Sequence, residues 1–177
     1  MNKRLEEKFN ELENSRNLLL GRLSRVDEKI LIIPPKEKKW SIAQIFFHLN
    51  QAETLSIIYV RKKMQGLPNI ENTGIVARLK LILAKIILWQ PIPYQAPAVL
   101  GEVPEKINYS EIVDKWNETR NNLKQLLNDI PEDALTKELF KQPTAGRLNI
   151  YQMLDFMQSH FERHKKQVEK IIKMKLK

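Results

Sequence analysis

The feature that most constrains the fold is a set of four long segments in which apolar residues recur at helical spacing. Residues three, four and seven apart lie on one face of a helix, so such a stripe predicts an amphipathic helix with one buried face. The segments span about 2–26, 41–64, 110–129 and 150–172. In the last of them the stripe consists of Ile150, Met153, Leu154, Met157, Phe161, Val168, Ile171 and Ile172. Four such stripes can be buried against one another, which predicts a helical bundle.

Capping residues and prolines mark the ends of these helices. Ser41 with Gln44, and Asn149 with Gln152, have the spacing of capping boxes, in which the two side chains satisfy each other's backbone N–H groups. A shorter apolar helix is predicted over 75–90, and we expect an irregular stretch after it, at Pro91, Pro93, Pro97 and Pro104. The sequence therefore predicts one all-α domain over 1–177, an up-down four-helix bundle whose one long crossover carries an extra short helix.

Composition and charge narrow the class of protein. The chain has no cysteine, which excludes a disulfide framework, a thiolate ligand and a cysteine nucleophile. The net charge is +9, but the basic residues are mostly interleaved with acidic ones, so we expect no specific binding of nucleic acid. The first residues lack the apolar stretch of a secretory signal. We therefore expect a cytoplasmic protein.

The segment 75–89 is the most apolar part of the chain and is interrupted by Arg78, Lys80 and Lys85. As a helix of about 22 Å it is too short to cross a hydrocarbon core of about 30 Å, so we expect no membrane insertion. Three interpretations stay open: part of the core, a dimer interface, or a basic amphipathic surface for a membrane or a partner helix. We favour a bundle or dimer core, because apolar residues outnumber any polar face.

The three histidines of the chain carry its most informative chemistry. His160 and His164 are four residues apart and share the apolar face of the last helix, and His48 lies beside the stripe of the second. A buried polar group without a partner costs about 1–3 kcal/mol, so each inward imidazole needs one. A structural role would explain any one of them. Three together, two at i, i+4 spacing, favour one divalent metal ion per chain.

Three histidines leave coordination positions open, which is typical of catalytic rather than structural metal sites. Zinc and nickel are the metals we expect first, and ferrous iron also accepts imidazole ligands. Glu53, Gln44 and Gln167 are candidates to orient an imidazole, to act as a base or to hold a bound water.

Two stretches resemble the DinB/YfiT-like superfamily. One is 39–49, with its Trp-Ser start and its His48-Leu ending, followed by Glu53. The other is 146–151, a glycine turn and capped helix start, followed by the His160 to His164 pair and Gln167. The resemblance covers essentially the whole chain, except that 70–110 is generic. It implies a four-helix bundle, usually a homodimer, with the three matched histidines as metal ligands. In one departure, Gln44 stands where several relatives have an acidic residue.

The resemblance also implies an activity, because relatives include bacillithiol-type thiol S-transferases and metal-dependent isomerases or hydrolases. We expect a metal-dependent enzyme that joins a low-molecular-weight thiol to an electrophilic small molecule. The absence of cysteine from the chain fits a reaction in which a separate small molecule supplies the thiol. The alternatives are a hydrolase that uses metal-activated water, and a non-catalytic, metal-stabilised stress-response or binding module. We expect the substrate to enter near the proline-rich crossover.

Overall fold

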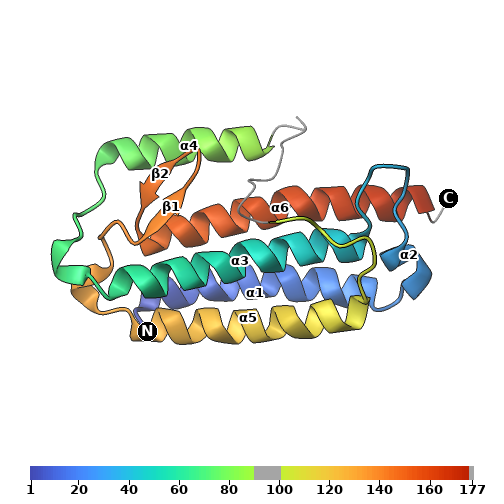
Figure 1. Cartoon of the computed structure of the whole chain (residues 1–177), viewed down its shortest axis with the longest axis horizontal. Coiled ribbons are helices and arrows are strands. Elements are labelled where there is room, and N and C mark those ends of the chain that lie inside the picture. Colours follow the sequence, from blue (N-terminus) through green and yellow to red (C-terminus); the bar gives the residue numbers. More distant parts are fainter. Residues whose placement is uncertain (90–100, 176–177) are drawn as a thin grey trace.

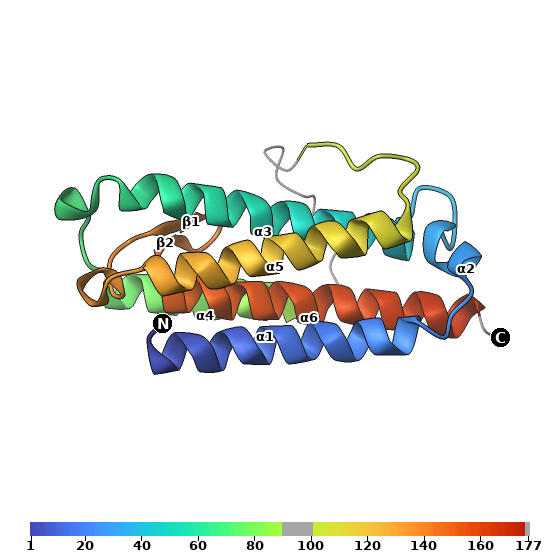
Figure 2. The same cartoon turned by 90° about the horizontal axis from the view of Figure 1, so that it is seen from below.

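The computed structural model describes residues 1–89 and 101–175 and confirms the all-α bundle with one long crossover and an extra short helix (Figure 1). Four long helices lie side by side. Two run in one direction and two in the other, as both views show (Figures 1 and 2). The first pair is α1 (Lys3–Leu23) and α6 (Ile150–Lys175), and the opposite pair is α3 (Ile42–Met64) and α5 (Tyr109–Asp129).

The crossover explains why α3 and α5 run parallel although they are consecutive helices of the bundle. After α3 the chain turns through a short 3-10 helix, η1 (Leu67–Asn69), and returns along α4 (Ile75–Trp89) before α5 begins. In Figure 1 α4 lies on the outside of the bundle, alongside α6. Pro104 lies in an irregular segment, as predicted, whereas Pro91, Pro93 and Pro97 lie outside the described residues.

Both predicted capping boxes are present. The Gln44 N–H donates to Ser41 Oγ at 3.2 Å and the Ser41 N–H donates to Gln44 Oε1 at 2.8 Å. At the start of α6 the Gln152 N–H donates to Asn149 Oδ1 at 3.0 Å, and the Asn149 N–H donates to Gln152 Oε1 at 2.9 Å. Each box satisfies two backbone donors that have no partner within the helix. The local sequence therefore fixes where the two histidine-bearing helices begin.

Several short elements were not predicted from the sequence. Before α6 the chain forms an antiparallel hairpin of two three-residue strands, β1 (Phe140–Gln142) and β2 (Gly146–Leu148). Gly146 has φ +80°, a conformation that favours glycine. Strands this short show no alternation that a sequence pattern could reveal. A one-turn helix, α2 (Glu28–Ile32), follows α1. The sequence after Pro131 does favour one further turn at 132–135, and the chain forms η3 (Glu132–Ala134) there.

A layer of buried polar side chains divides the core into two apolar clusters. One cluster contains Leu12, Ile57, Leu123 and Met157, and the other contains Leu19, Phe46, Trp116 and Phe161. Between them along α3 and α5 lie Glu53 and Arg120, which are 3% and 1% exposed. Burying charge is costly unless it is paired, so these groups need partners inside the bundle.

One face of α4 packs into the bundle core, as one of the interpretations of this segment had it, and the opposite face points outward. Of its described side chains, Leu81 and Ala84 are buried, whereas most of its large aliphatic residues face outward. None of the helices in the described part of the chain combines the length and hydropathy that a membrane-crossing segment needs.

Candidate metal centre

The structure brings the three histidines together between two helices. His48 projects from α3, and His160 and His164 project from successive turns of α6. His160 Nε2 lies 3.2 Å from His48 Nε2 and 3.2 Å from His164 Nε2. One ligand atom from each ring lies within 4.8 Å of the other two, and His48 and His164 are buried.

The arrangement of these nitrogens fits a divalent cation better than it fits hydrogen bonding alone. A neutral imidazole nitrogen either donates one proton or offers one lone pair. His160 Nε2 therefore cannot donate a hydrogen bond to one neighbouring histidine and accept one from the other. A cation accepts a lone pair from each ring. Two nitrogens bound to one tetrahedral zinc at about 2.05 Å lie about 3.3 Å apart. The two separations of 3.2 Å from His160 Nε2 are close to that value.

Burial keeps the three rings in the form that binds metal. Desolvation lowers the pKa of His48 to about 4. The pKa of His164 falls to about 3, chiefly through desolvation and then through the neighbouring His48. The pKa of His160 also lies well below its ordinary value, chiefly through desolvation and then through the neighbouring His164 and His48. All three rings are therefore neutral at pH 7, and protons do not compete with a metal there.

Gln167 lies within hydrogen-bond distance of one of the rings. Its Oε1 lies 3.0 Å from His164 Nδ1, so the Nδ1–H donates to the amide and the lone pair is left on Nε2, which faces the other histidines. The structure thus places Gln167 against a candidate ligand, at the distance a supporting hydrogen bond needs.

Replacing Gln167 with alanine should weaken metal binding by about 10–100-fold, because the His164 ring loses the partner that fixes its tautomer. Competition with a chelator of known affinity measures this change. Lys166→Ala is the control, since it is the neighbouring residue but lines a different surface of α6. Equal affinity in the two variants would show that Gln167 does not orient the ring.

Two aromatic rings flank the histidines. The Trp40 ring centroid lies 5.1 Å from that of His48, and Phe156 stacks on His160 with ring centroids 5.8 Å apart and planes 9° apart. Both aromatic side chains are half-buried. The imidazole cluster therefore has apolar walls, which favour apolar groups beside it.

A model of the DinB superfamily matches residues 11–168, a range that contains all three histidines. The chain belongs to the DinB superfamily. A search of curated proteins and a search of solved structures each found no match. The resemblance inferred from the two sequence stretches is thus confirmed at the level of the superfamily.

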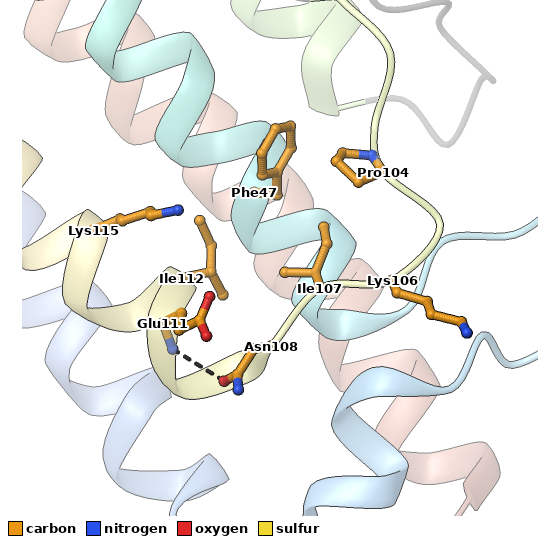
Figure 3. A pocket seen from close by; sticks show the side chains of 8 residues that line it. All are labelled: Phe47, Pro104, Lys106, Ile107, Asn108, Glu111, Ile112 and Lys115. Carbon is orange, nitrogen blue, oxygen red and sulfur yellow. Dashed lines mark hydrogen bonds between the residues drawn. The ribbon is translucent and has the colours of Figure 1, made fainter.

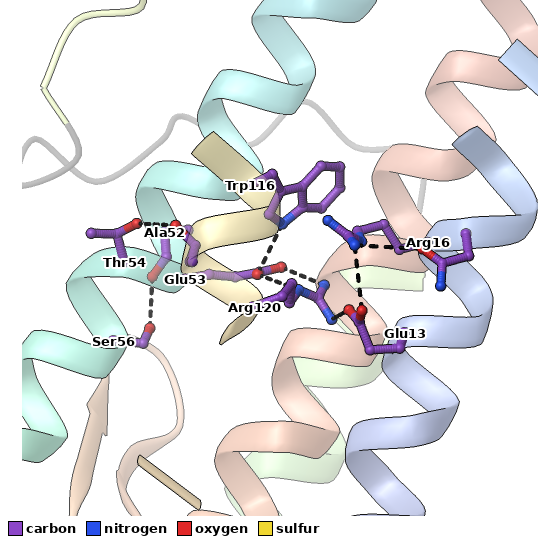
Figure 4. Close-up of polar contacts among 10 residues, drawn as sticks. Glu13, Arg16, Ala52, Glu53, Thr54, Ser56, Trp116 and Arg120 are labelled. Atoms are coloured by element: carbon purple, nitrogen blue, oxygen red, sulfur yellow. Dashed lines mark hydrogen bonds and ion pairs between the residues drawn. The ribbon is translucent and has the colours of Figure 1, made fainter. Parts of the chain in front are cut away.

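In this DinB-superfamily chain, Glu53 is not part of the histidine cluster. Its carboxylate accepts hydrogen bonds from Arg120 Nε at 2.7 Å, Arg120 Nη2 at 2.8 Å and Trp116 Nε1 at 3.0 Å (Figure 4). Arg120 Nη1 also donates to Glu13 Oε1 at 3.2 Å. Because both carboxylate oxygens of Glu53 are bound to a guanidinium, the residue joins α3 to α5 and is not placed as a base.

Gln44 is likewise engaged away from His48. Besides the capping box, its Nε2 donates to the Pro104 carbonyl at 2.9 Å. The side chain therefore ties the returning crossover to the start of α3. An acidic side chain at this position could not donate that hydrogen bond, so the departure from the pattern of relatives has a structural role here.

A groove does lie beside the returning crossover, where Figure 3 shows Phe47 of α3 together with Pro104 and Ile107 of the crossover around it. None of the three histidines is among its lining residues. A groove therefore lies where we expected the substrate to enter, but the three candidate metal ligands do not line it.

Sequence reasoning missed the buried ion-pair cluster around Arg120. A signal was present, because Trp116, Arg120 and Leu123 follow one another at spacings of four and three on the buried face of α5. An arginine within such a stripe points inward. It predicts an acidic partner from a neighbouring helix, although the sequence does not say which one.

Proposed function

We propose that this chain is a metal-dependent enzyme that transfers a low-molecular-weight thiol to an electrophilic small molecule. The observation that carries the proposal is the convergence of three neutral imidazoles, two of them buried, on one point, with two Nε2–Nε2 separations that suit a tetrahedral ion. Membership of the DinB superfamily supports it.

His48, His160 and His164 would hold the ion, and Gln167 would keep the His164 ring in the correct tautomer. A divalent ion held by these residues would lower the pKa of a thiol or a water bound beside the imidazoles. In the proposed substitution, a bond forms between the thiol sulfur and the electrophilic carbon. The bond from that carbon to the leaving group breaks, the leaving group keeps the electron pair, and the thiol proton passes to solvent.

Two features favour a thiol over water as the nucleophile. A thiol, with a pKa near 8.5, needs far less activation than water, with a pKa near 15.7. Among the described residues, the group that can hold a metal consists of the three histidines, and the one acid in their neighbourhood on α3, Glu53, is bound to Arg120. Glu53 is therefore not placed as a base to help a water. The half-buried Trp40 and Phe156 suit an apolar electrophile.

We further propose a cytoplasmic location, where such thiols are kept reduced. We also propose that the chain forms a homodimer, as its resemblance to the superfamily implies. Sedimentation velocity at several protein concentrations measures the oligomeric state directly.

Metal analysis tests the site itself. Tag-free protein is stripped with a chelator, reloaded with zinc, nickel or ferrous iron, and analysed for bound metal. We expect close to one ion per chain for the wild type and for Ser159→Ala, a neighbour on α6, and little for His160→Ala. Circular dichroism checks that each variant is folded. Equal metal contents in His160→Ala and the wild type would contradict the proposed ligand set.

Activity then separates the candidate functions. Loaded protein is incubated with an aromatic halide in the presence and the absence of a low-molecular-weight thiol, and the products are identified by mass spectrometry. Thioether formation that requires both thiol and metal supports the proposal. Metal-dependent hydrolysis of activated esters without thiol would instead favour the hydrolase. A fully loaded protein with neither activity, but a much higher melting temperature, would favour a metal-stabilised binding module.

A further inference from the structure

The outer face of α4 is the largest apolar surface that the described part of the chain leaves uncovered on one helix. Six aliphatic side chains of this helix are between 48% and 80% exposed: Ile75, Val76, Leu79, Ile82, Leu83 and Ile86. The opposite face packs on the bundle through Leu81 and Ala84. Monomeric soluble proteins rarely leave such a continuous apolar patch exposed, so this face is built to contact something.

The charges of α4 border this apolar face on both sides. Each residue advances about 100° around a helix, which places Lys80 on one flank and Arg78 and Lys85 on the other. The helix contains no acidic residue. The arrangement is an apolar stripe between two basic edges, on an element that lies outside the four-helix bundle (Figure 1).

The basic edge continues onto the neighbouring helix. A hollow of about 450 Å³ between α4 and α6 is lined by Ile82 and Ile86 together with Lys85, Arg163 and Lys166. Glu162 also lines it, and its carboxylate lies 3.2 Å from Lys165 Nζ. Apolar side chains and cations therefore face the same space on this side of the protein.

We propose that the outer face of α4 binds the surface of an anionic lipid bilayer. The helix would lie in the plane of the membrane, with its aliphatic side chains at the boundary between headgroups and acyl chains. Lys80, Arg78 and Lys85 would contact the lipid phosphates from the two flanks. At about 22 Å the helix is long enough to lie on the bilayer and too short to cross it. Binding through this face requires no metal at the histidines.

Charge decides between this partner and a second copy of the chain. Two α4 faces placed together would bring three cations from each copy, with no acid in either helix to pair with them. Anionic lipids supply the opposite charge on both flanks at once. The net charge of +9 acts in the same direction, because it attracts the whole molecule to a negative surface.

Vesicle flotation tests the proposal with the full-length protein, stripped of metal and reloaded with zinc in parallel. The vesicles contain phosphatidylcholine alone or phosphatidylcholine with phosphatidylglycerol. The test variant is Leu79→Glu with Leu83→Glu, at side chains 57% and 60% exposed. The control is Leu18→Glu on α1, where the leucine is 71% exposed. Lys80→Gln and Lys85→Gln probe the charges.

We expect the wild type and the Leu18→Glu control to float with the anionic vesicles at low salt, and to be released at high salt. The double glutamate variant should remain unbound, and each lysine replacement should weaken binding roughly fivefold. Three results would overturn the proposal: no flotation of the wild type at low salt, equal binding to the neutral vesicles, or equal binding of the double variant. A wild-type dimer that the double variant converts to a monomer, without vesicle binding, would assign the face to a second copy.

Discussion

Replacing Glu53 with alanine should lower the free energy of unfolding by about 3–5 kcal/mol, because it leaves a buried arginine without its main counter-charge. Arg120 is 1% exposed and donates two hydrogen bonds to Glu53, at 2.7 and 2.8 Å. After the substitution, its remaining acidic partner is Glu13, at 3.2 Å. Trp116 also loses the acceptor of its indole N–H. Urea denaturation at pH 7 measures the change.

Glu169→Ala is the matched control for Glu53→Ala. Glu169 pairs with Arg22 at 2.8 Å, but the two side chains are 30% and 60% exposed. Ion pairs in such exposed positions contribute only about 0–1 kcal/mol. If Glu53→Ala lowered the free energy of unfolding by as little as the control does, the buried network would be hydrated and would contribute little to stability. Glu53→Gln keeps one acceptor oxygen for Arg120 but removes the counter-charge, so it should also lose stability, by less than Glu53→Ala.

The metal-free protein should lose stability steeply as the pH falls from about 6.5 toward 4. The ordinary histidine pKa is 6.5, and burial lowers it to about 4 for His48 and about 3 for His164. Between these values the unfolded chain binds protons that the folded chain does not. The stabilisation is therefore present above pH 6.5 and is lost as the pH falls toward the folded-state pKa. Each such histidine contributes a slope of about 1.4 kcal/mol per pH unit.

Urea denaturation between pH 7.5 and 5.5 in the presence of a chelator tests this dependence, because few carboxylates titrate in that range. With His160 shifted in the same direction, the three histidines together give a slope of up to about 4 kcal/mol per pH unit. His160→Ala should remove one of the three contributions. Zinc should raise the stability at pH 7.5 and be released on acidification. A stability that does not change over this range would show that the rings are hydrated.

Local sequence signals were enough to predict the four long helices and the helix face on which each histidine lies. The stripe from Ile150 to Ile171 predicted α6, and the two capping boxes predicted the starts of α3 and α6. The i, i+4 spacing placed His160 and His164 on successive turns. These features depend on contacts within one helix, which is why they can be read from a single chain.

What the sequence by itself determined was therefore the bundle, the starts of α3 and α6 and the inward direction of three histidines. Only the tertiary structure decided that Glu53 faces Arg120, that Gln44 holds the crossover, and that α4 lies outside with its apolar face uncovered. Each of these outcomes depends on which neighbouring helix a side chain meets across the bundle. That choice follows from the packing of residues far apart in the chain, and helical periodicity carries no information about it.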